Sequence, residues 1–208
     1  MTDLIEMLAR LSTSHTSYNL YPFNSPETNI YGAELNLRKS LGFIAPGMEV
    51  LRQLYVSGNF SWLRGTVSDK ATDVTRQMGI TLHERPMTGL APYTVNAGLM
   101  WQGAQFGAAI NYGRTGRKLV MVGEREALDQ YEKPRNVLDV QLSGRFLNER
   151  LEVKLNASDL LHEDYVKYMN SKKTLERAPG SLDYDPYDWT LQRIKRGVNI
   201  TLSVGYKF

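Results

Sequence analysis

The strongest constraint on this chain is an alternation of apolar and polar residues that repeats in seven separate segments. In the last segment, GVNITLSVGYKF, every second residue from Val198 to Phe208 is apolar, and the residues between them are polar or small. Side chains on a β-strand point alternately to opposite faces, so this period predicts strands with one apolar and one polar face. The seven segments are 30–41, 53–63, 93–101, 104–112, 135–146, 150–158 and 197–208.

The connections between these segments alternate in length. QG, LNER and GFIAPGMEVLR are short, and Asn148 and Glu149 in LNER fit a tight hairpin turn. The connections 64–92, 115–135 and 161–194 are long and are expected to be loops. Long structureless loops are unusual in compact soluble domains, whereas outer-membrane barrels have short turns at one end and long loops at the other.

Composition narrows the classes of protein that fit. The mean hydropathy is −0.38, and no apolar run reaches the ~18 residues that a membrane-spanning helix requires. A membrane β-barrel is still compatible with this hydropathy, because its strands are apolar on one face only. The net charge of +3 is too small to indicate nucleic acid, and the absence of cysteine excludes disulfides and thiolate metal sites.

The first ten residues, MTDLIEMLAR, lack the basic start and the apolar stretch of a secretory signal. Taken alone, this indicates the cytoplasm, and the alternative is a chain that lacks its true N-terminus. DLIEMLARL is also the one stretch whose pattern would fit a helix, although it fits the end of a strand equally well.

Large aromatic residues recur near the ends of the expected strands. In a membrane barrel such rings form two girdles at the boundaries between lipid and water. In a soluble protein they would fill a core between a sheet and helices. Because helical patterns are nearly absent, the girdles are the favoured interpretation. The residues are Trp62, Tyr93, Trp101, Tyr112, Phe146, Tyr206 and Phe208.

Four stretches carry a resemblance to a known family: IYGAELNLRKSL (30–41), RPMTGLAPYTVNAGLMW (85–101), NVLDVQLSGRFLNERLEVKLNASDLLHEDY (136–165) and the final LSVGYKF. In the second, Arg-Pro and Pro-Tyr introduce a strand that reads Val-Asn-x-Gly-Leu, and the third contains Asn-x-x-Asp-Leu-Leu. In this order they resemble the barrel of TonB-dependent outer-membrane receptors, especially those of Bacteroidetes-type bacteria. The resemblance covers essentially the whole chain.

The resemblance implies an all-β fold, namely an antiparallel transmembrane β-barrel fragment of about seven to eight strands with long extracellular loops and short periplasmic turns. Residues 1–208 would form a single partial domain, the C-terminal section of the barrel, with the plug domain and the signal peptide of the family absent. Residues 1–8 would be the outer end of a strand whose first half is missing. The expected location is the outer membrane of a Gram-negative cell.

The resemblance also implies a function, the energy-coupled uptake of a nutrient ligand by a receptor. The expected partners are outer-membrane lipid, the outer-membrane assembly machinery, TonB acting through the missing N-terminal part, and a small-molecule, glycan or peptide ligand. Neither a cofactor nor nucleic acid is expected. Tyr206 and Phe208 would be the signal that the assembly machinery reads.

The sequence offers no catalytic constellation, so no enzymatic activity is expected. His15, His83 and His162 all fall in expected loops, and neither a phosphate-binding loop nor metal-ligand spacing occurs. The densest feature is DYDPYDW, in which carboxylates would suit calcium and flat rings would suit sugars. A solvent-facing loop with mutually packed rings fits the same pattern. The candidate ligand-binding residues are Asp183, Tyr184, Asp185, Tyr187, Asp188 and Trp189.

Two other functions fit the alternation. The first is a complete eight-stranded outer-membrane barrel, whose interior is normally filled by its own side chains. The second is a soluble β-barrel around a small apolar ligand, which would leave the long loops and the aromatic strand ends unexplained. Against the first alternative, the polar face carries many small residues: Ser57, Gly98, Gly107, Ser143 and Ser203.

Overall fold

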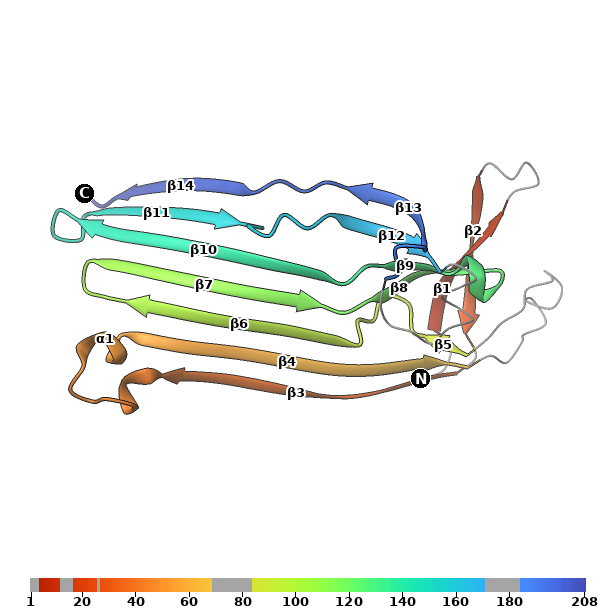
Figure 1. The fold of residues 1–208 in the computed structure, drawn as a ribbon, viewed down its shortest axis with the longest axis horizontal. Coiled ribbons are helices and arrows are strands. Elements are labelled where there is room, and N and C mark those ends of the chain that lie inside the picture. Colours follow the sequence, from red (N-terminus) through yellow and green to blue (C-terminus); the bar gives the residue numbers. More distant parts are fainter. Residues whose placement is uncertain (1–3, 12–16, 26, 69–83, 171–183) are drawn as a thin grey trace.

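The computed structural model of the chain describes residues 4–11, 17–25, 27–68, 84–170 and 184–208, which form two sheets (Figure 1). The strands are β1 (Leu4–Leu11), β2 (Tyr18–Ser25), β3 (Thr28–Ser40), β4 (Leu54–Val67), β5 (Arg85–Pro86), β6 (Tyr93–Gln102), β7 (Phe106–Thr115), β8 (Lys118–Gly123), β9 (Gln130–Glu132), β10 (Arg135–Phe146), β11 (Leu151–Ser158), β12 (Tyr165–Met169), β13 (Trp189–Ile194) and β14 (Asn199–Tyr206). The helical elements are η1 (Leu41–Phe43), α1 (Glu49–Arg52) and η2 (Glu126–Leu128).

The large sheet has the strand order β14-β11-β10-β7-β6-β4-β3, and the two-residue β5 pairs with the end of β4. Every pairing in it is antiparallel. Figure 1 shows these strands side by side, with short turns at one end, called the turn end below, and the second sheet at the other, called the small-sheet end. The expectation of an all-β, antiparallel fold is confirmed, and all seven periodic segments are strands.

The register places the apolar residues of these strands on one face of the large sheet. One row across that face contains Val56, Leu99, Ile110, Val140, Ala157 and Ile200, each opposite the next. On the other face, Asn36, Asn59 and Asn96 lie opposite one another. Because one residue of register shift would exchange the two faces, the alternation fixes which residues pair.

Two of the three connections at the turn end are tight. Residues 103–105 join β6 to β7, and the N–H of Gly103 donates to the carbonyl of Phe106 at 2.9 Å. Residues 147–150 join β10 to β11, and φ is positive at Asn148 (54°) and Glu149 (66°). The third connection, between β3 and β4, contains η1 and α1, two helical turns that the alternation did not predict.

The small sheet has the strand order β13-β12-β9-β8-β1-β2. Its pairings are antiparallel except that of β1 with β8, which is parallel. This sheet corrects two expectations. The connections 115–135 and 161–194 are not loops throughout, because they contain β8, β9, β12 and β13. Residues 4–11 form a strand, one of the two alternatives that the pattern left open, but this strand pairs with β2 and β8 instead of ending a strand of the large sheet.

A closed hydrophobic core explains why these short strands form. Its buried residues are Leu8, Phe23, Leu119, Val122, Tyr131 and Tyr168, and Tyr184 packs against them. The ring of Tyr168 lies 5.9 Å from that of Tyr131 and 5.1 Å from that of Tyr184. Mutual burial of these side chains removes them from water and stabilises the sheet. Strands of three to six residues are too short to show a convincing alternation, so the sequence pattern missed them.

A buried ion pair ties the small sheet to the end of β4. Arg85 Nη2 lies 2.6 Å from Glu6 Oε2, and both side chains are 2% exposed. The hydroxyls of Ser25 and Thr88 each donate to the same carboxylate at 2.5 Å. Burial alone would raise the pKa of Glu6, but these hydrogen bonds and the Arg85 guanidinium outweigh it and lower the pKa. The charged carboxylate therefore links β1, β2 and β5.

Candidate functional site

A ladder of asparagines crosses the polar face of the large sheet. Asn59 Nδ2 donates to Asn36 Oδ1 at 2.5 Å, and Asn96 Nδ2 donates to Asn59 Oδ1 at 3.4 Å. One row closer to the small-sheet end, Ser61 Oγ donates to Glu34 Oε1 at 3.2 Å. Because an amide carries both donors and an acceptor, the ladder presents both kinds of group to a polar ligand.

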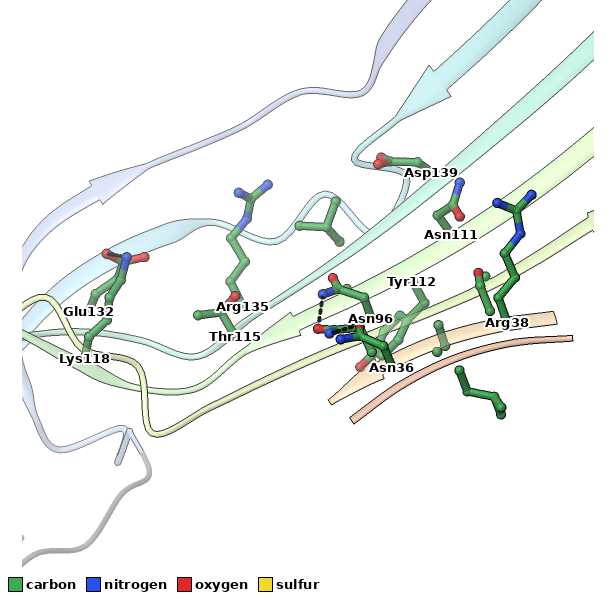
Figure 2. Close-up of a pocket in the computed structure, with 18 residues that line it drawn as sticks. Asn36, Arg38, Asn96, Asn111, Tyr112, Thr115, Lys118, Glu132, Arg135 and Asp139 are labelled. Atoms are coloured by element: carbon green, nitrogen blue, oxygen red, sulfur yellow. Dashed lines mark hydrogen bonds and ion pairs between the residues drawn. The ribbon is translucent and has the colours of Figure 1, made fainter. Parts of the chain in front are cut away.

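A hollow of about 800 Å³ lies over this ladder, within the range of small-molecule sites. Side chains from five neighbouring strands of the large sheet contribute to it, and Lys118 and Glu132 of the small sheet close one side (Figure 2). The polar side chains of the large sheet that line it include Asn36, Arg38, Asn96, Asn111, Arg135 and Asp139.

The space in this hollow depends on a glycine in the strands beneath it. A Cβ atom on Gly98 would lie 2.6 Å from Ser57 Oγ and 2.7 Å from Asn111 Oδ1, closer than real Cβ atoms approach. Ser57 and Gly98 belong to the small residues that the sequence places on the polar face, and the hollow lies directly above them. The remaining space is therefore a consequence of residue size along the strands.

Charged groups at the small-sheet side of the hollow are paired. Lys118 Nζ lies 3.0 Å from Glu132 Oε2, and Arg135 pairs with Asp159. The lining residues are mainly amides, hydroxyls and glycines, and the amides and hydroxyls can hydrogen-bond a polar ligand. Neutral hydrogen-bonding groups flanked by paired charges suit a polar solute or water.

A second hollow, of about 320 Å³, lies on the same face nearer the turn end. Its floor includes Gly107 and Ser143, two more of the small residues, and Lys154 lies 3.0 Å from Glu152 at its edge. The polar face thus carries two open spaces rather than a filled interior.

The stretch DYDPYDW has its rings in two different environments. Tyr184 packs against the core of the small sheet, with Lys133 Nζ 5.2 Å from its ring centroid. Tyr187 and Trp189 are exposed at the surface. Asp183 lies outside the described residues. The structure therefore leaves two of the predicted rings accessible to a ligand and uses a third in packing.

The aspartates of this stretch form a turn. The backbone N–H of Asp185 donates to Asp188 Oδ2 at 3.0 Å, and Asp185 Oδ1 accepts from the N–H of Tyr187 at 2.9 Å. A carboxylate that accepts backbone N–H groups stabilises such a turn. Among the described residues, no group of three or more acidic or histidine side chains is placed to hold a metal ion. The two carboxylates thus have a structural role, and their role toward a ligand stays a prediction.

The two residues predicted as an assembly signal lie together at the turn end. Tyr206 is opposite Leu151 at the edge of the large sheet, and its ring lies 5.2 Å from that of Phe208 in an edge-to-face contact. Phe208 is fully exposed. Its ring is therefore accessible to a partner.

No family model matches the chain, and neither a curated protein nor a solved structure is similar to it at a significant level. In the part of the chain that the structure describes, no helix is long and apolar enough to cross a membrane. The case for a function therefore rests on the residues and their arrangement.

Sequence reasoning placed Asn36 and Asn59 on the polar face but did not single them out. An asparagine at the polar position of three successive strands was the available signal, and the register that aligns them is visible only in the sheet. Arg85 and Arg117 line a separate cavity. Arg85 belongs to the Arg-Pro pair of the stretch 85–101, but nothing in that pattern indicated a cavity, and Arg117 belongs to no motif.

Proposed function

We propose that the chain is the C-terminal section of the barrel of a TonB-dependent outer-membrane receptor, which takes up a nutrient ligand with energy supplied through TonB. The observation that carries the proposal is the apolar face of the large sheet, which no described segment covers. Large side chains such as Leu35, Leu155 and Leu202 are 66%, 40% and 65% exposed. Soluble monomers rarely expose a contiguous apolar surface of this kind, whereas lipid covers it in a membrane barrel.

The height of the apolar face supports a lipid environment. Trp62 is opposite Tyr93 at the small-sheet end, and Leu54 is opposite Trp101 at the turn end. The two pairs are eight residues apart on each strand, which at roughly 3.4 Å per residue is about 27 Å. An outer-membrane barrel has an apolar band of about 25 Å between two aromatic girdles.

Polar residues mark the limit of this apolar band at the small-sheet end. Arg114 follows Tyr112 on the same face of β7, and its Nε donates to Tyr93 Oη at 3.1 Å. Arg114 Nη1 also donates to Asn136 Oδ1 at 3.0 Å. A charged group that binds a tyrosine hydroxyl is typical of the boundary where lipid gives way to water.

The polar face fits the lumen of a large barrel. A complete eight-stranded barrel is filled by its own side chains, whereas glycine and serine here lie beneath two hollows. A soluble barrel around an apolar ligand would enclose the apolar face, and both hollows lie on the polar one. These two alternatives are therefore less well supported than a section of a wider barrel.

The proposal assigns partners to the surfaces. Lipid covers the apolar face, and further strands pair with the edges at β3 and β14. The assembly machinery recognises Tyr206 and Phe208, and TonB acts through an N-terminal part of the receptor. The nutrient, a small molecule, glycan or peptide, contacts the loops, for which Tyr187 and Trp189 are the exposed candidates.

Arginine substitutions on the two faces test the proposal. Leu155→Arg and Leu202→Arg place a charge on the lipid side at two residues that face each other across β11 and β14. Near the middle of the bilayer such a charge costs about 2–4 kcal/mol, so both variants should fail to insert. Heat-modifiable mobility on a gel reports the assembled barrel.

Asn156→Arg and Ser203→Arg are the matched controls, since each lies next in sequence and on the polar face. They should assemble like the unsubstituted protein. Equal tolerance of arginine on the two faces would contradict the membrane assignment.

A further inference from the structure

A cavity of about 410 Å³ lies where the end of β4 meets the small sheet. Its walls include the apolar side chains of Trp62, Leu63, Leu90 and Leu119, together with Pro86 and Pro92. Three arginines, Arg64, Arg85 and Arg117, also line it, and Glu84 is the one carboxylate among the lining residues. The cavity is thus apolar in its walls and cationic in its polar groups.

Arg117 is the unusual member of this group. The residue is 5% exposed, and its Nη1 atom is buried without a hydrogen-bond partner. Its guanidinium carbon lies 4.2 Å from the ring centroid of Tyr131, a cation–π contact. Within the described part of the chain no carboxylate forms an ion pair with it. A buried guanidinium in that state is costly unless something negative or polar enters beside it.

Gly116, the residue before Arg117, allows the backbone to pass close to Tyr93. Its N–H donates to the carbonyl of Tyr93 at 2.9 Å, and a Cβ atom at this position would lie 2.9 Å from the Tyr93 ring. The chain therefore passes close to β6 and brings Arg117 into the cavity wall. A bulkier residue at position 116 would displace it.

Arg85 supplies further unused donors. One side of its guanidinium binds Glu6, whereas Nε and Nη1 are buried and have no hydrogen-bond partner among the described residues. Glu6 is the ion-pair partner of Arg85. Arg117 has no ion-pair partner among the described residues, and a buried carboxylate in this region, that of Asp129, is directed to the hydroxyl of Tyr131 and the N–H of Gly123.

We propose that this cavity binds a small organic carboxylate, with the anionic group beside Arg117 and Arg85 and the apolar body against Trp62 and the leucines. A carboxylate can accept two parallel N–H bonds from a guanidinium, and its apolar body would suit the apolar walls, which inorganic phosphate would not. The volume lies within the range of small-molecule sites, and its largely apolar walls with a few polar groups are typical of them. The proposal does not depend on the membrane assignment, because the cavity belongs to the junction of the two sheets.

Isothermal titration calorimetry on the whole chain in detergent tests this with three probes. Benzoate carries the carboxylate and an apolar ring, benzamide has the same shape without the charge, and inorganic phosphate has charge without the ring. Saturable binding of benzoate, with benzamide and phosphate at least about tenfold weaker, is the expected result. Equal binding of benzoate and benzamide, tighter binding of phosphate, or no saturation with benzoate would overturn the proposal.

Two variants assign the binding to Arg117. Arg117→Met should lower benzoate affinity by at least about tenfold, because a hydrogen bond to a charged group is lost. Its unfolding temperature without ligand should be equal to or above that of the parent, because an unmatched buried charge is removed. Arg10→Met removes the same charge from an arginine of the small sheet that lies at the surface and pairs with Glu124, and this variant should bind benzoate normally. A marked loss of stability in Arg117→Met, or equal losses of affinity in both variants, would show a purely structural role.

Discussion

The two sheets are built from similar residues, yet only one of them has a core. Among the residues that the structure describes, nine of the ten buried apolar ones belong to β1, β2, β8, β9 and β12 of the small sheet. The tenth, Val67, is the last residue of β4, where the two sheets meet. The large sheet has longer strands and a more regular alternation, but its apolar side chains lie at the surface.

The difference shows what alternation can and cannot specify. An alternation with a period of two residues indicates that a strand has one apolar and one polar face. The register then aligns these faces across the sheet. It does not state what covers the apolar face. In the small sheet the apolar side chains are buried against one another and against Tyr184, whereas in the large sheet no described segment covers them.

The largest expected effect follows directly from this contrast. In water without detergent, the chain should not form a stable monomer, because the apolar face and the edges at β3 and β14 are uncovered. Size-exclusion chromatography should show large assemblies that detergent converts to a defined species. A monodisperse 23.6 kDa species without detergent would instead favour the soluble barrel.

One substitution made in both sheets separates a protein core from a lipid-facing surface. Leu119→Ala removes a side chain that is 1% exposed, and it should destabilise the small sheet by about 2–5 kcal/mol. Leu142→Ala removes one that is 49% exposed on the large sheet, and if lipid covers this face as proposed it can fill the space, so the cost should be much smaller. Chemical denaturation of the protein in detergent measures both. Similar losses of stability would mean that the large sheet has a packed core as well.

The same contrast explains which parts of the fold could be predicted. Seven strands of the large sheet were predictable because each shows its alternation over eight or more residues. In the small sheet, β8, β9, β12 and β13 have only three to six residues, too few to show an alternation. β1 and β2 have eight residues each, but the pairing of β1 with β8 joins distant parts of the chain. Of the candidate site, the polar residues could be assigned to a face. The aligned asparagines and the cavity around Arg117 depend on contacts between strands, which a single sequence does not display.

Two exposed aromatic residues near the end of the chain, Phe208 and Trp189, should differ in their effect on assembly. On the proposed function, deleting Phe208 should lower the amount of assembled protein and increase its degradation in the periplasm, because the assembly machinery would lose its signal. Trp189→Ala, which removes another exposed ring, in β13, should leave assembly unchanged. Surface labelling of intact cells measures both variants. An unchanged surface level after deletion of Phe208 would reduce this residue to an ordinary surface ring.

The smallest expected effect concerns the response of the small sheet to acid. The pKa of Glu6 is lowered in the folded protein below its ordinary value of 4.5, so its ion pair and hydrogen bonds stabilise the fold fully above that value. This contribution should be lost as the pH falls from 4.5 through the lowered pKa, and β1 and β2 should lose protection from amide hydrogen exchange there before the long strands do. Glu6→Gln should be less stable at neutral pH and should lack this loss in acid. Glu124→Gln removes a carboxylate that pairs with Arg10 near the surface, and it should retain the acid response of the parent. If Glu6→Gln and the parent lost protection over the same range of pH, another group would be the one that titrates.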